Sequence, residues 1–153
     1  MKILSVSVAA YNVEKTLDEC LSHFIDDEVL DDLDIMVIDD GSKDNTLNIL
    51  NELAGEDDHV RYISFSRNFG KEAAMYAGFC NADGDYVAVM DADMQDPPAL
   101  LPKMLKILES GEYDSVATRR STRMLQLFRA LQLSIGVAFI SMSVPKFLRT
   151  ARR

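Results

Sequence analysis

The chain has 153 residues and a formal net charge of −9, with 48% hydrophobic and 27% charged residues. This composition fits one globular domain with a buried core and excludes a disordered or fibrous chain. The charge is unevenly divided, because residues 1–118 contain all 25 acidic residues, while residues 119–153 contain half of the 16 basic ones. The acidic body argues against nucleic acid as a partner.

Apolar runs alternate with helical patterns along this acidic body. Short apolar or alternating runs indicate strands, and apolar residues at a spacing of three and four indicate helices. Strict alternation with short connections predicts a Rossmann-like α/β fold, with a mainly parallel sheet and helices on both faces. In chain order the pattern predicts a strand at 3–10, a helix at 16–25, a strand at 34–40, a helix at 45–53, a strand at 60–65, a helix at 70–82, a strand at 86–90, a helix at 99–108 and a strand at 113–118.

Polar side chains follow each of the first four predicted strands. Because the carboxyl ends of parallel strands meet at one edge of a sheet, these four groups are expected to share a single pocket. Chance turn residues would explain one group well and all four poorly. The groups are Tyr11, Asn12 and Glu14 after the first strand, Asp39, Asp40 and Ser42 after the second, Arg67 and Lys71 after the third, and Asp91, Asp93 and Gln95 after the fourth.

These side chains have the chemistry to hold a nucleotide diphosphate. Asp91 and Asp93 end a buried strand and have the oxygen ligands for one hard cation, Mg²⁺ or Mn²⁺. Arg67 and Lys71 suit phosphate groups, and carboxylates suit a base and ribose hydroxyls. Simpler interpretations compete with this one. The acids at 91 and 93 would then be solvated loop residues, and Arg67 would form a surface ion pair. Asp39 and Asp40 would shape a turn before the next helix, a role that is compatible with a function in binding.

Several other classes of site fail on spacing. No GxGxxG follows the first strand and no GxxxxGK[ST] occurs, which argues against a dinucleotide site and a P-loop. Residues 91–102 fail as an EF-hand loop, because Asp96 stands where glycine is needed and Pro102 where glutamate is needed. An aspartyl phosphatase would also use two aspartates with Mg²⁺, but after the first strand instead of the fourth.

Four motifs stand in order along the body: AYN at 10–12, VIDDGSKDNT at 37–46, SRNFGKEAA at 66–74 and DADMQDPP at 91–98. Together they resemble the family 2 glycosyltransferases, which have the GT-A fold for nucleotide-diphospho-sugars. The last two look like the branch with dolichol-phosphate mannose synthase and the bacterial polyprenyl-phosphate glycosyltransferases. The resemblance covers residues 3–120, and it is specific because several motifs occur in the right order.

The resemblance implies a role for individual residues. Asp39 would contact the base, and Asp91 the ribose or the metal-bound region. Asp93 and Gln95 would hold the metal with Asp91, and Asp91 and Asp93 would be the catalytic residues. Together with the polar groups above, the expected substrate-binding residues are Ala10, Tyr11, Asn12, Glu14, Asp39, Asp40, Ser42, Arg67, Lys71, Asp91 and Arg119.

The reaction implied by the resemblance moves a sugar, with inversion, from a GDP- or UDP-sugar to an acceptor, here a polyprenyl phosphate. Mg²⁺ or Mn²⁺ would neutralise the leaving diphosphate. A phosphate monoester, with a second pKa near ~6, is ionised at neutral pH and needs little help from a general base. The family normally continues after Arg120 with acceptor-binding structure. A second hypothesis is therefore a non-catalytic nucleotide-sugar-binding or assembly subunit.

Residues 121–153 are expected to form a basic, apolar tail after a nucleotide-sugar-binding domain at 1–120. The uncharged stretch 130–144 is shorter than the roughly 20 residues of a spanning helix, which favours an interfacial helix, then a docked helix, then a transmembrane span. Basic residues suit an anionic membrane surface, and an apolar face would favour homo-oligomers. Without a visible signal peptide or CxxC pair, the sequence indicates a cytoplasmic protein at the cytoplasmic face of the membrane.

Overall fold

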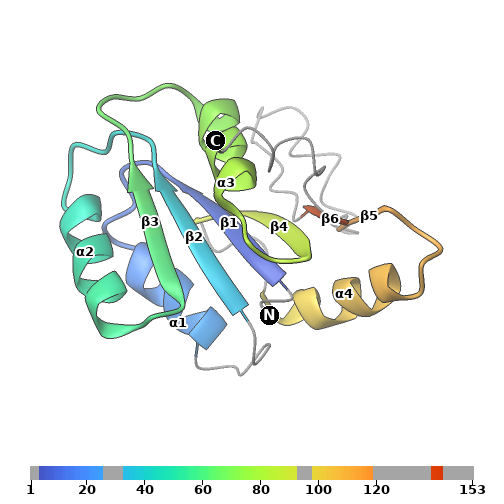
Figure 1. Ribbon diagram of the computed structural model, residues 1–153. Coiled ribbons are helices and arrows are strands. Elements are labelled where there is room, and N and C mark those ends of the chain that lie inside the picture. The colour runs from blue at the N-terminus through green and yellow to red at the C-terminus, as the bar shows by residue number, and fades with distance from the viewer. Residues whose placement is uncertain (1–3, 26–32, 93–97, 119–138, 143–153) are drawn as a thin grey trace, which may run out of the picture.

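The computed structural model describes residues 4–25, 33–92, 98–118 and 139–142. Within this part of the chain, six strands form one sheet in the order β3-β2-β1-β4-β6-β5 (Figure 1). The strands are β1 (Leu4–Ala10), β2 (Leu33–Asp39), β3 (Val60–Ser64), β4 (Tyr86–Asp91), β5 (Ser115–Ala117) and β6 (Phe139–Met142).

The sheet is mainly parallel, as the alternation of elements predicts. Strand β1 pairs in parallel with both β2 and β4, and β2 pairs in parallel with β3. Strand β6 lies antiparallel between β4 and β5. The register places Ala10 beside Asp39 and Ala9 beside Asp91, so the carboxyl ends of β1, β2 and β4 meet at one edge.

Helices cover both faces of the sheet, as predicted (Figure 1). On one face, Leu4, Val6 and Val8 of β1 are fully buried in a core cluster with residues of three helices. Each fully buried leucine or valine there stabilises the fold by roughly 1.5–3 kcal/mol. The other face is covered by a single described helix, α3. The helices are α1 (Leu17–Ile25), α2 (Thr46–Glu56), α3 (Lys71–Asn81) and α4 (Leu101–Glu109), with a 3₁₀ turn at Pro98–Leu100 before α4.

Helix α3 lies very close to β1 because both carry small residues at their contact. Ser7 of β1 is buried, and Gly78 of α3 stands directly over it. A Cβ atom at Gly78 would overlap Ser7 Oγ and lie 2.7 Å from Ser7 Cβ, so only glycine fits this spacing. The first residue of α3, Lys71, is thereby held near the carboxyl ends of β1 and β4.

A polar network closes the opposite edge of the sheet, where the strands begin. Asp34 of β2 is fully buried, and Arg61 of β3 donates to both its oxygens, at 2.8 and 2.6 Å. Ser5 Oγ donates to Asp34 at 2.8 Å and accepts the backbone N–H of Gly84 at the same distance. Arg61 also pairs with Asp83 at 3.2 Å. We call these residues the Asp34 network; it joins three strands to the turn before β4.

The predicted helix in the tail is wrong at residues 139–142, which form strand β6. The physical reason is that β4 presents an open edge, whose backbone groups β6 satisfies with antiparallel hydrogen bonds. The rest of the predicted tail, 119–138 and 143–153, lies outside the described residues. In the described part of the chain, no helix combines the length and apolar character needed to cross a bilayer.

Candidate functional site

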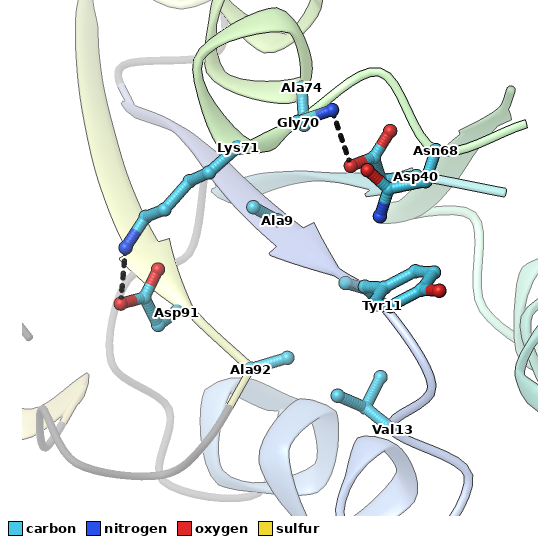
Figure 2. A pocket seen from close by; sticks show the side chains of 11 residues that line it. Ala9, Tyr11, Val13, Asp40, Asn68, Gly70, Lys71, Ala74, Asp91 and Ala92 are labelled. Atoms are coloured by element: carbon cyan, nitrogen blue, oxygen red, sulfur yellow. Dashed lines mark hydrogen bonds and ion pairs between the residues drawn. The ribbon is translucent and has the colours of Figure 1, made fainter. Parts of the chain in front are cut away.

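A pocket of about 330 Å³ lies at the edge of the sheet where β1 and β4 end (Figure 2). Its walls come from the ends of these two strands, the loop after β2 and the first turn of α3. Figure 2 shows the side chains of Asp40, Lys71 and Asp91 around its polar part. The lining residues are Ala9, Ala10, Tyr11, Val13, Asp40, Asn68, Gly70, Lys71, Ala74, Asp91 and Ala92.

The loop after β1 is tied to the loop after β2 by reciprocal hydrogen bonds. The backbone N–H of Asn12 donates to Ser42 Oγ at 2.9 Å, and Asn12 Oδ1 accepts the N–H of Lys43 at 2.9 Å. Glu14 Oε2 accepts the N–H of Asn45 at 2.9 Å, at the start of α2. Asn12, Glu14 and Ser42, which we predicted to bind substrate, therefore connect two loops beside the pocket and are absent from its lining.

Asp39 is 1% exposed and has hydrogen-bond partners on both carboxylate oxygens. Oδ1 accepts the backbone N–H of Ser42 at 3.0 Å, and Oδ2 accepts the hydroxyl of Ser64 at 2.7 Å. The first bond is the local turn that the simpler interpretation expected. Asp39 thus shapes the loop after β2 and fixes it to β3, and it does not line the pocket.

Asp40 lines the pocket and fixes the loop before α3. It is 4% exposed, and its two oxygens accept the backbone N–H groups of Phe69 and Gly70 at 2.7 and 3.0 Å. These donors precede Lys71, the first residue of α3. A carboxylate in this position stabilises the start of the helix through its dipole. Asp40 therefore positions the wall of the pocket that carries Lys71.

Asp91 and Lys71 form an ion pair at one side of the pocket (Figure 2). The Lys71 Nζ atom lies 2.7 Å from Asp91 Oδ2, and both side chains line the pocket. Asp91 is the last residue of β4 and its side chain is 21% exposed, whereas that of Lys71 is 52% exposed. This pair brings together two predicted site residues that come from separate elements.

Arg67 does not line the pocket, and its guanidinium stacks on the ring of Phe69, 4.7 Å from the centroid. The Phe69 ring also meets Phe65 edge-on at 5.6 Å. Gly41, with φ of 69°, lies so close to the backbone of Arg67 that a side chain would collide with it. This contact fixes the loop after β2 against the loop after β3.

Besides Asp40, whose two oxygens accept backbone N–H groups, the described lining offers one carboxylate to a divalent cation, that of Asp91. Asp91 offers a hard carboxylate at the pocket wall, and Mg²⁺ in proteins is often held by one or two carboxylates plus substrate phosphates. The described residues contain no group of three or more His, Cys, Asp or Glu that could hold a metal by themselves. Asp93, Gln95 and Arg119, which we predicted for the metal and the phosphates, lie outside the described residues.

Of the predicted site residues, the structure brings Ala10, Tyr11, Asp40, Lys71 and Asp91 into one pocket. Sequence reasoning missed the apolar part of its wall, which consists of Ala9, Val13, Ala74 and Ala92. Ala74 had a usable signal, because it stands one helical turn after Lys71 and so shares its face.

The fold is that of the GT-A glycosyltransferases, which are its structural neighbours. The mannosyltransferase PcManGT from Pyrobaculum calidifontis, solved with GDP-Man and Mn²⁺, matches 97% of this chain and 46% of its own, with a TM-score of 0.70 and 19% identity. Glucosyl-3-phosphoglycerate synthase from Mycobacterium tuberculosis, solved with UDP, matches 92% of this chain and 57% of its own, with a TM-score of 0.67 and 23% identity.

The sequence narrows the class further. Residues 5–147 match the family model described as glycosyl transferase family 2, and the chain belongs to this family. The resemblance seen in the four motifs is thereby confirmed.

Curated relatives include several enzymes named undecaprenyl-phosphate 4-deoxy-4-formamido-L-arabinose transferase. The one from Proteus mirabilis is 40% identical over 129 residues, which are 82% of this chain and 39% of the relative. The one from Photorhabdus laumondii is 35% identical over 144 residues, which are 92% of this chain and 44% of the relative. The chain thus spans less than half the length of these relatives.

Proposed function

We propose that this chain is the donor-binding part of a glycosyltransferase that moves a sugar from a nucleotide-diphospho-sugar to a polyprenyl phosphate. The observation that supports it is the placement of Asp91 and Lys71, an anion and a cation, in one pocket at the carboxyl ends of β1 and β4. Open α/β sheets bind their ligands at this edge. The structural neighbours solved with GDP-Man and Mn²⁺ or with UDP support a nucleotide-sugar donor.

In this proposal Asp91 is a ligand of Mg²⁺ or Mn²⁺, together with Asp93 and Gln95. The cation would supply positive charge against the negative charge that develops on the leaving diphosphate. Lys71 would add a second positive charge at the same phosphates. Asp40 keeps the first turn of α3 in place by its bonds to Phe69 and Gly70. Asp39, at the end of β2, would act on the donor through the loop after β2, which its hydrogen bonds to Ser42 and Ser64 hold in place.

The acceptor is proposed from the names of the relatives, which act on undecaprenyl phosphate. A phosphate monoester is already an anion at neutral pH and attacks without losing a proton to the protein. A lipid acceptor also requires the protein to work at a membrane surface. The eight basic residues of 119–153 would supply attraction to anionic headgroups there.

Calorimetric titration with UDP and with GDP, each with and without Mn²⁺, tests the donor site. We expect Mn²⁺-dependent binding of one of the two nucleotides. Asp91→Asn should weaken this binding by about 10- to 100-fold, because a charged ligand is replaced by a neutral one. Asp85→Asn makes the same change at the exposed turn before β4 and should leave binding unaltered. Metal-independent binding, or none by a folded chain, would contradict the donor site.

Transfer itself is tested by supplying undecaprenyl phosphate in detergent with radiolabelled UDP- and GDP-sugars. Formation of a labelled lipid supports a glycosyltransferase. Binding of the donor without transfer or hydrolysis for any lipid phosphate would favour the alternative, a non-catalytic nucleotide-sugar-binding subunit.

A further inference from the structure

The ion pair between Lys71 and Asp91 joins the start of α3 to the end of β4 at one side of the pocket (Figure 2). The ammonium contacts one carboxylate oxygen at 2.7 Å. The lysine side chain is half exposed, at 52%, and its four-carbon stem is flexible. Ion pairs with this exposure contribute little to stability, so the contact is easily exchanged for another.

The charges that line the pocket make Asp91 the carboxylate whose partner can change. Among the described lining residues, Asp40 and Asp91 are the acids and Lys71 is the base. Asp40 is held by two backbone N–H groups of the loop before α3, which can move only if the backbone of that loop moves. Asp91, by contrast, is paired with a side chain that has freedom to move.

Lys71 also stands where a helix disfavours a cation. It is the first residue of α3, near the positive end of the helix dipole. An anion at this position is favoured by the dipole and by the lysine together, and phosphate groups commonly bind at such helix starts. The side chain therefore gains from any anion that comes close, whether this is Asp91 or a diphosphate.

We infer that Lys71 and the divalent cation compete for Asp91. When the cation binds to Asp91, the Lys71 ammonium moves from Asp91 to the donor's diphosphate. This inference rests on the proposed function, since it assumes a cation and a diphosphate in this pocket. An ammonium 2.7 Å from a carboxylate oxygen and a Mg²⁺ at about 2.1 Å from it would repel each other strongly at such close range. Lys71 thus neutralises Asp91 when no cation is bound, and it neutralises the leaving phosphates when the cation and the donor are bound.

The two arrangements predict opposite effects for one substitution. Lys71→Met removes the competitor of the cation, so Mn²⁺ alone should bind about two- to fivefold more tightly. The same change removes the positive charge that would lie beside the diphosphate. UDP or GDP at saturating Mn²⁺ should therefore bind about 10- to 100-fold more weakly. A purely structural lysine would move both affinities in the same direction or neither.

The experiment uses the full chain and two titrations. Free Mn²⁺ is followed by its electron paramagnetic resonance signal, first without nucleotide, and the nucleotide is then titrated calorimetrically at saturating Mn²⁺. Lys103→Met is the matched control, because it removes the same charge from the exposed side of α4, and both affinities should stay at the wild-type value. Lys71→Arg keeps the charge, so Mn²⁺ alone should bind it as it binds the wild type.

Opposite shifts in Lys71→Met, with none in Lys103→Met, support the competition. If the wild type binds Mn²⁺ and nucleotide but Lys71→Met binds Mn²⁺ equally or more weakly, the competition is overturned while the proposed function stands. If the folded wild type binds neither Mn²⁺ nor nucleotide, the proposed function fails and the inference falls with it.

Discussion

The two ends of the parallel strands each hold an aspartate paired with a base, but the two pairs are built differently. Where the strands begin, Asp34 is fully buried and Arg61 grips both its oxygens. Where they end, Lys71 contacts one oxygen of Asp91 in an open pocket. The Asp34–Arg61 pair is thus part of the packed interior at one edge of the sheet, whereas the Asp91–Lys71 pair lies in a pocket open to ligands at the other edge.

The difference follows from the chemistry of the two bases. A guanidinium is planar and always charged, and it binds a carboxylate through two parallel bonds. The pKa of Arg61 is raised chiefly by its hydrogen bond to Asp34, which stabilises the charged form of the guanidinium. An ammonium on a flexible stem makes a single contact that other ions can replace. The Arg61–Asp34 pair therefore stabilises the fold, whereas the Lys71–Asp91 pair can exchange its partners in the pocket.

The largest effect is expected at the structural end. Arg61→Met removes the guanidinium that pairs with the buried Asp34 and should lower the free energy of unfolding by about 3 kcal/mol. Lys71→Met makes the same change at the pocket and should lower it by less than about 1 kcal/mol. Urea unfolding followed by circular dichroism measures both. Equal losses in the two variants would contradict the distinction between the two ends.

A smaller loss of unfolding free energy is expected for a substitution between the two ends of the strands, where α3 packs on β1. Gly78→Ala places a methyl group against Ser7 and should cost about 1–3 kcal/mol of unfolding free energy. It should also weaken nucleotide binding, because α3 carries Lys71. The matched control is Gly55→Ala in α2, where nothing lies within 4 Å of the new atom, and which should stabilise the chain by about 0.5–1 kcal/mol.

Ser7→Gly provides the test of mechanism for Gly78→Ala. If the crowding lies between these two residues, the double variant should lose less stability than the sum of the two single variants. Strict additivity would mean that the cost of alanine at position 78 arises elsewhere in α3.

The smallest effect concerns acid stability at the pocket end. Burial raises the pKa of Asp44, but hydrogen bonds from Thr46 and from the backbone of Glu14 outweigh this and lower it. A carboxyl group with a lowered pKa stabilises the fold above its ordinary pKa of 3.8, and this contribution is lost as the pH falls through the lowered value. Asp44→Asn should therefore flatten the fall in thermal midpoint below pH 4. An unchanged acid profile would show that Asp44 contributes nothing measurable.

The sequence predicts the strands, the parallel sheet and the shared edge, because their signals are local and strongly periodic. Strand β6 escapes prediction since its residues, Phe139–Met142, lie in a long apolar stretch whose pattern does not distinguish strand from helix. Their state is decided by the open edge of β4, far away in the chain.

The sequence predicts which residue types form the candidate site, but it does not predict which atoms these residues contact. Asp40 and Asp91 both follow strands, but only the folded chain shows that one holds backbone N–H groups and the other an ammonium. The Asp34 network gave no signal, because Asp34 and Arg61 are 27 residues apart and neither belongs to a motif. Such pairings depend on register, which local sequence does not reveal.

The insertion of β6 between β4 and β5 has a consequence for the order in which the chain assembles. Strands β1 to β4, which hold the pocket, are complete once synthesis has passed Asp91. Within the described part of the chain, the sheet neighbour of β5 is β6, which exists only after residues 139–142 have been made. Since domains begin to fold during synthesis, we expect strands β1 to β4 to form their sheet first and β5 to join the sheet later. Pulsed deuterium labelling during refolding should protect the amides of β1 before those of β5, and the reverse order would refute this sequence of events.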